Sequence, residues 1–289
     1  MIIIDYSQTV ISNIMAELNM TKEKKLEVNL IRHMVLNTIR SYVTKFKEEY
    51  GPDIVIACDS RKYWRKDVFP NYKANRKKAR QESGLDWNLI FDTINLLKSE
   101  IKDHLPYQLV EIEGAEADDV IACYIQWIKS ENEKVLIVSA DHDFMQLHKF
   151  NNVYQWSPTK NGFVTCKVDP KDKLFEHIIK GDKGDGVPNV LSDDDSIVEG
   201  RRQKPIHTKK LNEWKLDHTC MPQDPGFVNN FERNQTLIDL SKIPDDIKDT
   251  IHSTFLNKNL QADDAKEKIK NYFQQHNLNN MLEVIEEFQ

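Results

Sequence analysis

Gly114-Ala-Glu-Ala-Asp-Asp-Val120 decides the fold, because it places three acidic side chains between a predicted strand and the first turn of a predicted helix. Upstream, residues 107–112 read as a strand. Downstream, apolar residues recur at positions 120, 121, 124, 125 and 128, which is helical spacing. The helix dipole alone favours a charged first turn, so this stretch by itself leaves a structural and a functional interpretation open.

Three other apolar runs end in aspartate. Asp5 follows residues 2–4, Asp59 follows residues 54–58, and Asp141 follows residues 135–140. Short apolar runs rich in β-branched residues predict strands buried on both faces. The fold class is therefore α/β, with a mostly parallel central sheet and helices on both faces. Ligands bind such sheets beyond the carboxyl ends of the strands, so we expect these acids to converge on one crevice.

A crevice lined with carboxylates needs cations. Two carboxylates about 4 Å apart repel by roughly 4 kcal/mol at an effective dielectric constant near 20. Oxygen ligands without nearby His or Cys select Mg²⁺ or Mn²⁺, and this many carboxylates predicts two ions. Paired ions are suited to in-line displacement at phosphorus. The sequence therefore predicts metal-dependent phosphodiester hydrolysis.

A further acidic group follows the fourth predicted strand. Asp141-His-Asp143 is expected to be extended, so that both carboxylates share one side and the histidine points away. Asp182 and Asp185 lie three residues apart in the loop 181–188 and can converge on one ion. The glycines of this loop do not fit the dinucleotide fingerprint, and its acids do not fit the calcium-loop pattern.

A strongly basic segment follows Asp59. Residues 61–80 hold nine basic side chains against one acid, with four aromatic side chains interleaved. This composition suits a groove for single-stranded nucleic acid, although a solvated helix face with core aromatics shares it. Lys73 and Arg76 share one face if helical and can reach the scissile phosphate, with Tyr72 stacked on a base. The expected nucleic-acid contacts are Arg61, Lys62, Arg65, Lys66, Tyr72, Lys73, Arg76, Lys77, Lys78 and Arg80.

Composition sets wider bounds. The chain has 289 residues and a formal net charge of −6, but its basic residues are segregated, so the average does not exclude nucleic acid. The four cysteines show no C-x-x-C spacing, and we expect reduced thiols. We find no signal peptide and no apolar stretch of transmembrane length, and we expect a cytoplasmic protein.

The chain is predicted to hold two domains. The first is a catalytic domain over residues 1–188 that includes a basic arch over 60–85, and the second is a smaller helical domain over 189–289. Helices are expected over 10–18, 28–46, 85–105, 170–180, 229–240, 244–256, 262–275 and 279–288, with a hairpin over 153–156 and 162–168. A second basic cluster either contacts duplex phosphates or forms a solvated loop; it comprises Arg201, Arg202, Lys204, Lys209 and Lys210.

Four motifs in order carry a family resemblance: NYKANR (71–76), GAEADD (114–119), SADHDF (139–144) and GDKGDG (181–186). The chain resembles the flap endonuclease / 5′-to-3′ exonuclease superfamily over nearly its whole length. Within that superfamily it is most similar to the ribonucleases H of T-even-like bacteriophages, through tracts such as RHMVLNTIR and LIDLSKIPDDI.

The resemblance implies a Mg²⁺-dependent, structure-selective 5′ nuclease with exonuclease, flap endonuclease and ribonuclease H activities. Such an enzyme leaves a 5′-phosphate and a 3′-hydroxyl, removes RNA primers and 5′ flaps during DNA replication, and accepts Mn²⁺. The implied first-ion ligands are Asp5, Asp59, Glu116 and Asp119, with Asp118 alongside. The implied second-ion ligands are Asp141, Asp143, Asp182 and Asp185. The implied catalytic residues are Asp5, Asp59, Asp119, Asp141, Lys73 and Arg76.

The implied substrates are DNA and RNA–DNA duplexes with a 5′ single-stranded flap. A monomer is expected, with a replication single-strand-binding protein as a partner; the C-terminal domain is a candidate for a protein-binding face, and the sequence does not name what binds there. One departure concerns residues 187–196, which lack the glycine-rich helix-hairpin-helix of the superfamily and leave duplex binding open. Two alternatives remain: a single-strand ribonuclease of PIN type, and a junction-binding protein that has lost catalysis.

Overall fold

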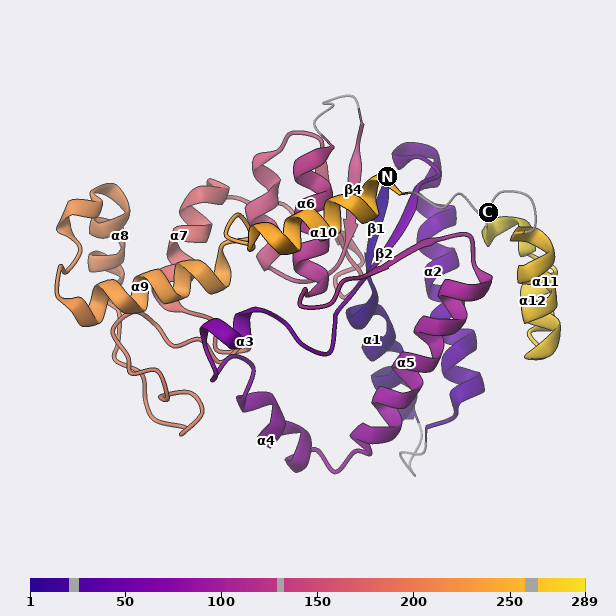
Figure 1. Cartoon of the computed structure of the whole chain (residues 1–289), viewed down its shortest axis with the longest axis horizontal. Helices are drawn as coiled ribbons and strands as arrows, with labels where there is room; N and C mark the ends of the chain where they lie inside the picture. The colour runs from indigo at the N-terminus through magenta and orange to yellow at the C-terminus, as the bar shows by residue number, and fades with distance from the viewer. Residues whose placement is uncertain (21–25, 129–132, 258–264, 289) are drawn as a thin grey trace.

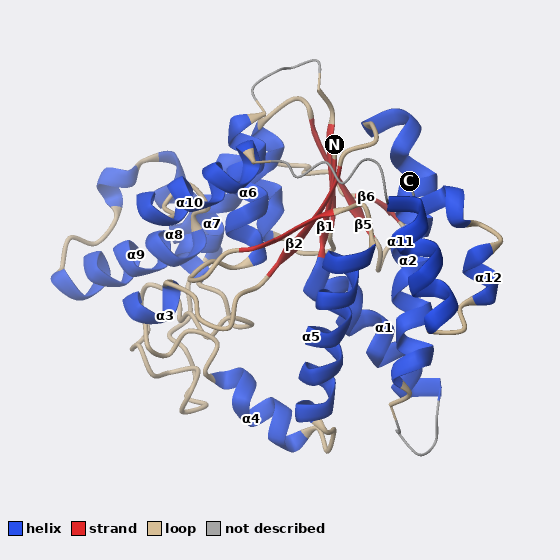
Figure 2. Cartoon of the chain, turned by 45° about the vertical axis from the view of Figure 1, so that its right-hand side comes forward, coloured by secondary structure: helices blue, strands red, loops and turns tan. Residues whose placement is uncertain are grey.

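The centre of the molecule is a six-stranded sheet in the order β3-β2-β1-β4-β5-β6. The computed structural model describes residues 1–20, 26–128, 133–257 and 265–288. The first five strands are parallel and β6 runs antiparallel to β5, with helices on either side of the sheet (Figure 2). The strands are β1 (Ile2–Asp5), β2 (Ile54–Cys58), β3 (Gln108–Glu111), β4 (Val135–Val138), β5 (Val153–Ser157) and β6 (Gly162–Phe163). The predicted fold class and edge hairpin are confirmed.

Successive side chains of each central strand enter opposite cores, as the twofold repeat of a strand requires. Ile2 and Ile4 lie in one core and Ile3 in the other, and all three are fully buried. The core around Ile2 is covered by α1 (Tyr6–Met20), α2 (Val28–Tyr50), α5 (Trp87–His104), α11 (Ala265–Gln275), α12 (Asn279–Leu282) and the 3₁₀ helix η3 (Ile285–Phe288). The core around Ile3 is covered by α6 (Ala117–Trp127), α10 (Asp245–Leu256) and the 3₁₀ helix η1 (Asp143–Lys149).

The remaining helices lie beyond the carboxyl ends of the strands or beside them. They are α3 (Arg65–Val68), α4 (Asn75–Glu82), α7 (Pro170–Lys180), α8 (Thr208–Leu216), α9 (Pro225–Ile238) and the 3₁₀ helix η2 (His218–Cys220). In Figure 1, α4 and its flanking loops form an arm between α3 and α5. Helix α8 was not predicted from the sequence, because only two side chains, Leu211 and Trp214, define its buried face.

The C-terminal third packs in three places. Helices α8 and α9 share a small core with α7 around Phe175 and Trp214. Helix α10 contributes Ile247 and Ile251 to the core on one face of the sheet, and α11 contributes Phe273 to the core on the other. The predicted range 262–275 begins at residues outside the described ones, and its remainder is α11. No helix among the described residues is both long and apolar enough to cross a membrane.

Candidate active site

Asp5 and Asp59 lie together at the carboxyl ends of β1 and β2. The parallel register places Asp5 opposite Ala57, so Asp59 emerges at the same edge of the sheet. Asp5 Oδ2 accepts a hydrogen bond from Ser139 Oγ at 3.0 Å, and Asp59 Oδ2 accepts one from Ser7 Oγ at 2.7 Å. Burial, followed by the charge of Asp59, raises the pKa of Asp5 to about 7. The charged form of Asp5 is thus disfavoured by its removal from water as well as by the neighbouring carboxylate.

Asp118 and Asp141 join this group. The backbone N–H of Asp141 donates to Ser139 Oγ at 3.1 Å, and the same serine holds the carboxylate that ends β1. The backbone N–H of Ala117 donates to Asp59 Oδ1 at 2.9 Å, which fixes the start of α6 against β2. Burial, and then the charge of Asp141, raises the pKa of Asp118 well above its usual range. The structure thus brings together carboxylates from four separate segments.

Asp119 points away from this group into a buried ion network. Its side chain is fully buried and accepts hydrogen bonds from both terminal nitrogens of Arg65, at 2.8 and 3.0 Å, and from Trp64 Nε1 at 3.1 Å. It also caps α6 by accepting the backbone N–H of Glu116 at 3.0 Å. With both oxygens held by a guanidinium that is itself enclosed, Asp119 does not have the geometry of the metal ligand predicted from the sequence. Of the two adjacent aspartates, Asp118 is the one near Asp141.

Arg65 is likewise placed differently from the prediction. Its side chain is 2% exposed, and besides Asp119 it contacts Glu116 Oε2 at 2.9 Å and the backbone carbonyl of Leu237 at 2.8 Å. A guanidinium enclosed in this way is not available to nucleic acid. It instead fastens the base of the arm to α6 and to the end of α9. Trp64 and Phe69 are also buried, so these aromatic side chains of the basic segment belong to the protein core.

Lys73 and Arg76 both pair with acidic side chains of the site, Glu116 and Asp185, but they do not share one helix face. Helix α4 begins at Asn75, and Lys73 precedes it with a positive φ of 57°. Lys73 Nζ lies 2.5 Å from Glu116 Oε1 and 3.6 Å from Asp185 Oδ2, and Arg76 pairs with Asp185. Burial alone disfavours the charge of Lys73, but Asp185 and Glu116 raise its pKa above the usual value. Lys73 therefore stays an ammonium.

Tyr72 does not have the free face that stacking on a base requires. Its side chain is buried, and its hydroxyl donates to Asp185 Oδ2 at 2.8 Å and lies 3.1 Å from Glu116 Oε2. Its ring packs edge-on against Tyr63, with centroids 5.7 Å apart. The predicted stacking role is therefore wrong for the structure as it stands. Tyr72 instead joins the two acids that also bind Lys73.

The glycine-rich loop 181–186 has a steric reason for its composition. Gly181 has a φ of +68°, and a Cβ there would lie 2.4 Å from the carbonyl oxygen of Val187. Gly186 has a φ of +74°, and a Cβ there would lie 2.9 Å from the carbonyl oxygen of Asn71. The loop consequently packs closely against the base of the arm, where the backbone N–H of Lys73 donates to the carbonyl of Asp185 at 2.7 Å.

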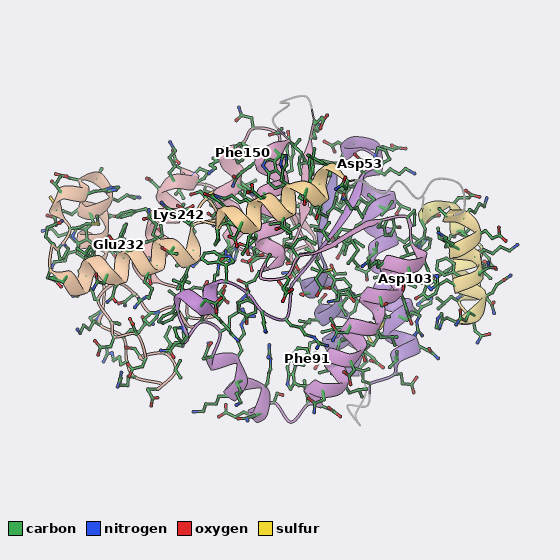
Figure 3. The ribbon with its side chains drawn as sticks, viewed as in Figure 1. Asp53, Phe91, Asp103, Phe150, Glu232 and Lys242 are labelled. Carbon is green, nitrogen blue, oxygen red and sulfur yellow. The ribbon has the colours of Figure 1, made fainter. Side chains whose placement is uncertain are left out.

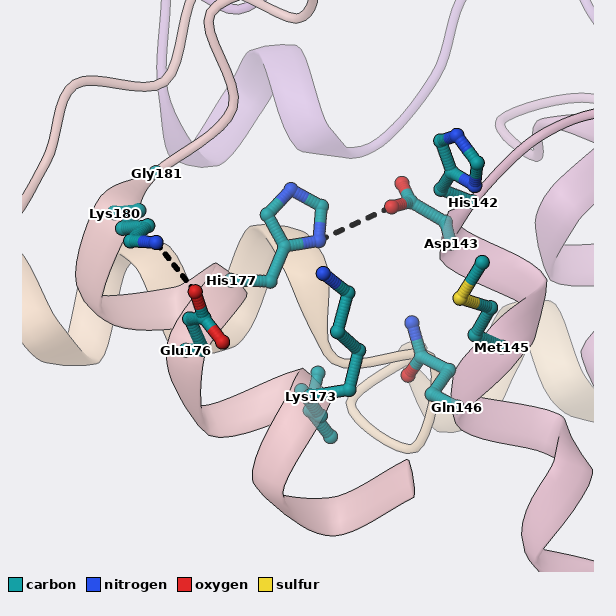
Figure 4. A pocket seen from close by; sticks show the side chains of 10 residues that line it. His142, Asp143, Met145, Gln146, Lys173, Glu176, His177, Lys180 and Gly181 are labelled. Carbon is teal, nitrogen blue, oxygen red and sulfur yellow. Dashed lines mark hydrogen bonds and ion pairs between the residues drawn. The ribbon is translucent and has the colours of Figure 1, made fainter. Parts of the chain in front are cut away.

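Asp141 and Asp143 are brought together by a turn and not by an extended segment. The backbone N–H of Asp143 donates to Asp141 Oδ1 at 2.9 Å, and a 3₁₀ helix starts at Asp143. His142 between them is exposed and borders the same pocket as Asp143 (Figure 4).

His177 near the end of α7 was missed by the sequence reasoning. Its Nδ1 lies 3.1 Å from Asp143 Oδ1 and its Nε2 lies 3.1 Å from Asp182 Oδ2; Figure 4 shows the ring directed at Asp143, with both side chains bordering a pocket. Burial opposes its charge, but the two carboxylates raise the pKa of His177 to about 10. The available signal was a histidine in the last turn of the helix that precedes the GDKGDG motif.

The acidic side chains differ in how tightly they cluster. Within the described part of the chain, Asp143, His177 and Asp182 form the only group of three potential metal-binding side chains whose ligand atoms all lie within 4.8 Å of one another. The first group, around Asp5 and Asp118, is more widely spaced. Its oxygen-only donor set and raised pKa values still fit a hard divalent cation, which would relieve the like-charge repulsion.

The other basic side chains of the arm are mostly free to meet a ligand. The exposed ones are Arg61, Lys62, Lys66, Lys77 and Lys78. Arg80 in α4 lies 4.9 Å from the ring centroid of Phe91 in α5, whose position Figure 3 labels, and so ties the far end of the arm to α5. The second basic cluster is also exposed, although Arg201 is paired with Asp195.

Comparison with known proteins identifies the class. Residues 1–175 match the family described as 5′-3′ exonuclease, N-terminal resolvase-like domain, and residues 169–288 match the family described as T4 RNase H, C terminal. The chain therefore belongs to the 5′-3′ exonuclease family of nucleases.

Within that family, the chain belongs to the T4 ribonuclease H type. It is 34% identical to the "Ribonuclease H" of Enterobacteria phage T4, over 99% of this chain and 95% of that protein. The "Exonuclease" of Escherichia phage T7 is 32% identical over 55% of this chain and 50% of that protein.

Solved structures share the fold. The T5 D15 protein co-crystallized with metal ions superposes with a TM-score of 0.65 at 19% identity, covering 88% of this chain and 97% of that one. The second structure is a variant of the bacteriophage T5 D15 flap endonuclease in a pseudo-enzyme-product complex with DNA and metal ions. It superposes with a TM-score of 0.60 at 18% identity, covering 96% of this chain and 98% of that one. Metal ions are thus bound in these two structures.

Proposed function

We propose that the chain is a structure-selective 5′ nuclease that hydrolyses phosphodiester bonds to a 5′-phosphate and a 3′-hydroxyl. The observation that carries this proposal is the convergence of Asp5, Asp59, Asp118 and Asp141 beyond the carboxyl ends of three parallel strands. Burial and mutual repulsion raise the pKa of Asp5, Asp118 and Asp141, so this cluster is suited to cations, and cations at such a place are suited to phosphate chemistry.

The proposed cofactor is a pair of Mg²⁺ ions, with Mn²⁺ as a substitute. Asp5, Asp59, Asp118 and Asp141 would hold the first ion, and Asp143, Asp182 and Asp185 the second. When bound, such ions supply a nucleophilic hydroxide at neutral pH and stabilise the departing oxygen. Glu116 contributes indirectly, because it is engaged by Arg65, Tyr72 and Lys73.

Lys73 and Arg76 are proposed to act on the scissile phosphate. In the structure their charges are neutralised by Glu116 and Asp185. If Asp185 binds the second ion, Arg76 would lose this acidic partner and Lys73 would keep only Glu116, so that both side chains could turn to the phosphate and stabilise its developing negative charge. The exposed lysines of the arm, such as Lys77 and Lys78, are proposed to contact the backbone of the 5′ single strand. Such contacts carry no sequence information and weaken steeply with salt.

The proposed substrates are DNA and RNA–DNA duplexes with a 5′ single-stranded flap, processed by exonuclease, flap endonuclease and ribonuclease H activities. This rests on the similar proteins, of which one is a phage ribonuclease H and one a flap endonuclease in complex with DNA. The task would be removal of RNA primers and 5′ flaps in replication, by a monomer in the host cytoplasm. The exposed second basic cluster is proposed to contact the duplex, and the C-terminal helices a replication single-strand-binding protein.

The proposal is tested by incubating a 5′-labelled flap duplex with the protein, with and without Mg²⁺, and sizing the products. Cleavage near the junction that requires Mg²⁺ supports it. Equal cleavage of unstructured single-stranded RNA would indicate a single-strand ribonuclease instead. Tight junction binding without cleavage in Mg²⁺ or Mn²⁺ would indicate a binding protein.

A further inference from the structure

The imidazole of His177 occupies a position between two acidic side chains that belong to the proposed second ion position. Its two ring nitrogens each lie 3.1 Å from a carboxylate oxygen, one of Asp143 and one of Asp182. The side chain is 24% exposed and comes from α7, whose neighbouring residues Ile178 and Ile179 are buried. The ring is therefore held by a rigid element and is still reachable from outside.

We propose that His177 is a ligand of the second ion, so that this position is a mixed nitrogen–oxygen site that favours Mn²⁺ or a similar transition metal over Mg²⁺. The inference rests on the proposed function, because it concerns the metal chosen at one of the two proposed ion positions. It assigns that position a nitrogen donor from α7, which lies outside the four acidic and basic motifs quoted from the sequence.

The geometry supports coordination in three ways. The ligand atoms of Asp143, His177 and Asp182 lie within 4.8 Å of one another. Whichever ring nitrogen binds the ion, the other keeps a carboxylate acceptor, and this is the arrangement that orients metal-binding histidines in proteins. The ring also borders a cavity of about 300 Å³, lined in part by Asp143 and Lys173, through which an ion and water can reach it (Figure 4).

Coordination exchanges one proton for the ion. In the metal-free structure both nitrogens face carboxylate oxygens, so both carry hydrogen. The nitrogen that binds the ion releases its proton to solvent, because only an unprotonated imidazole nitrogen is a ligand. The carboxylate on that side, for example Asp182, then binds the ion in place of the N–H.

The two ion positions therefore differ in chemistry. The first, around Asp5, Asp118 and Asp141, offers only oxygen atoms and suits Mg²⁺. The second offers an imidazole as well, and imidazole increases affinity along the series from Mn²⁺ to Zn²⁺ far more than for Mg²⁺. His142 is exposed, lies next in sequence to two of the acids and borders the same cavity, so it is the other imidazole that must be tested as a control.

The test uses the full chain loaded with Mn²⁺ and electron spin-echo envelope modulation, which detects a ¹⁴N nucleus bound directly to Mn²⁺. We expect a coordinated-imidazole ¹⁴N signal in the unaltered protein. His177→Gln should remove it, and His142→Gln should keep it. Calorimetry should show that His177→Gln weakens Mn²⁺ binding at one of two positions by about tenfold or more, with little change for Mg²⁺.

The outcomes separate the inference from the function it rests on. Two bound Mn²⁺ ions without a ¹⁴N signal would overturn the ligand role of His177 and leave the nuclease proposal intact. A signal lost in His142→Gln and kept in His177→Gln would also overturn it. Failure of Mn²⁺ and Mg²⁺ to bind at all would overturn both. Absence of the signal in the unaltered protein overturns the proposal whether or not a variant folds, and a signal that is present is assigned by comparing the two variants, whose folding circular dichroism checks.

Discussion

Arg65 donates to both carboxylate oxygens of Asp119, at 2.8 and 3.0 Å, and both side chains are almost completely buried. This pair joins the base of the basic arm to the first turn of α6, where Glu116 also accepts from the same guanidinium. The two adjacent aspartates of the GAEADD motif therefore have different roles. Asp119 holds the arm in place, and Asp118 contributes charge to the crevice.

The first prediction concerns stability. Asp119→Asn leaves the buried Arg65 charge without its full counter-ion, which should cost about 3 kcal/mol of unfolding free energy. Urea unfolding followed by circular dichroism measures this. Asp118→Asn is the matched control, because it removes a repelled charge and should leave stability unchanged or raised while abolishing cleavage. Equal stability of Asp119→Asn and the unaltered protein would show that the pair does not support the fold.

The second prediction separates chemistry from binding. Asp141→Asn removes one carboxylate from the first ion position and should abolish flap cleavage in Mg²⁺. Its affinity for the flap duplex should stay nearly the same, because the exposed basic side chains of the arm are untouched. Cleavage assays and fluorescence anisotropy check the two parts. Loss of binding in step with cleavage would make Asp141 a structural residue.

The third prediction concerns the arm. Lys73→Ala and Arg76→Ala should each lower turnover on a saturating flap substrate by about 100-fold, because each removes a donor aimed at developing charge. Lys78→Ala, at an exposed site farther along α4, should weaken affinity and salt dependence but leave turnover unchanged. If the first two variants turn over normally, Lys73 and Arg76 lie outside the reaction.

The fourth prediction concerns pH and divalent ions. The pKa of Asp5 is raised to about 7 in the metal-free fold. The folded state therefore keeps its proton to higher pH than the unfolded state does. The free energy of unfolding falls as pH rises from the ordinary carboxyl pKa to about 7, and this group does not change it at lower pH. Mg²⁺ binds the ionised form, so it should raise the Tm clearly at about pH 8 and little at about pH 5. Scanning calorimetry with and without Mg²⁺ measures the difference, and an equal increase at both pH values would contradict it.

Much of the fold follows from local sequence. Runs such as Ile2–Ile4 are short, apolar and β-branched, and they became central parallel strands whose terminal acids meet at one edge. The helices over 170–180 and 244–256 were also predicted almost to the residue, because their buried positions recur at helical spacing. The sheet order then brings Asp5, Asp59 and Asp141 together without further information.

The site features that could not be predicted from the sequence depend on contacts between residues far apart in the chain. Arg65 has the composition of a nucleic-acid contact, but its partner Asp119 lies 54 positions away, and only the folded chain reveals the pair. Tyr72 is buried for the same reason, by contacts with Glu116 and Asp185. His177 was overlooked because nothing local distinguishes a ring between two carboxylates from one in water.

The predicted division at residues 188 and 189 stays a prediction. The match to the N-terminal family ends at residue 175, and the match to the C-terminal family begins at residue 169. The helices that follow do not form one separate body. Helices α10 and α11 complete the two cores on either face of the N-terminal sheet. An amphipathic pattern predicts that a helix buries one face, but it does not identify the element against which that face packs.

The most direct test of the account is cleavage of one 5′-labelled flap duplex across a Mg²⁺ titration, with product lengths read at each concentration. If the converging carboxylates hold catalytic ions, the duplex stays intact in chelator, and short products cut near the junction accumulate as Mg²⁺ rises. Asp118→Asn gives none. Cleavage that persists in excess chelator, or an intact substrate at every Mg²⁺ and Mn²⁺ concentration, would contradict the account.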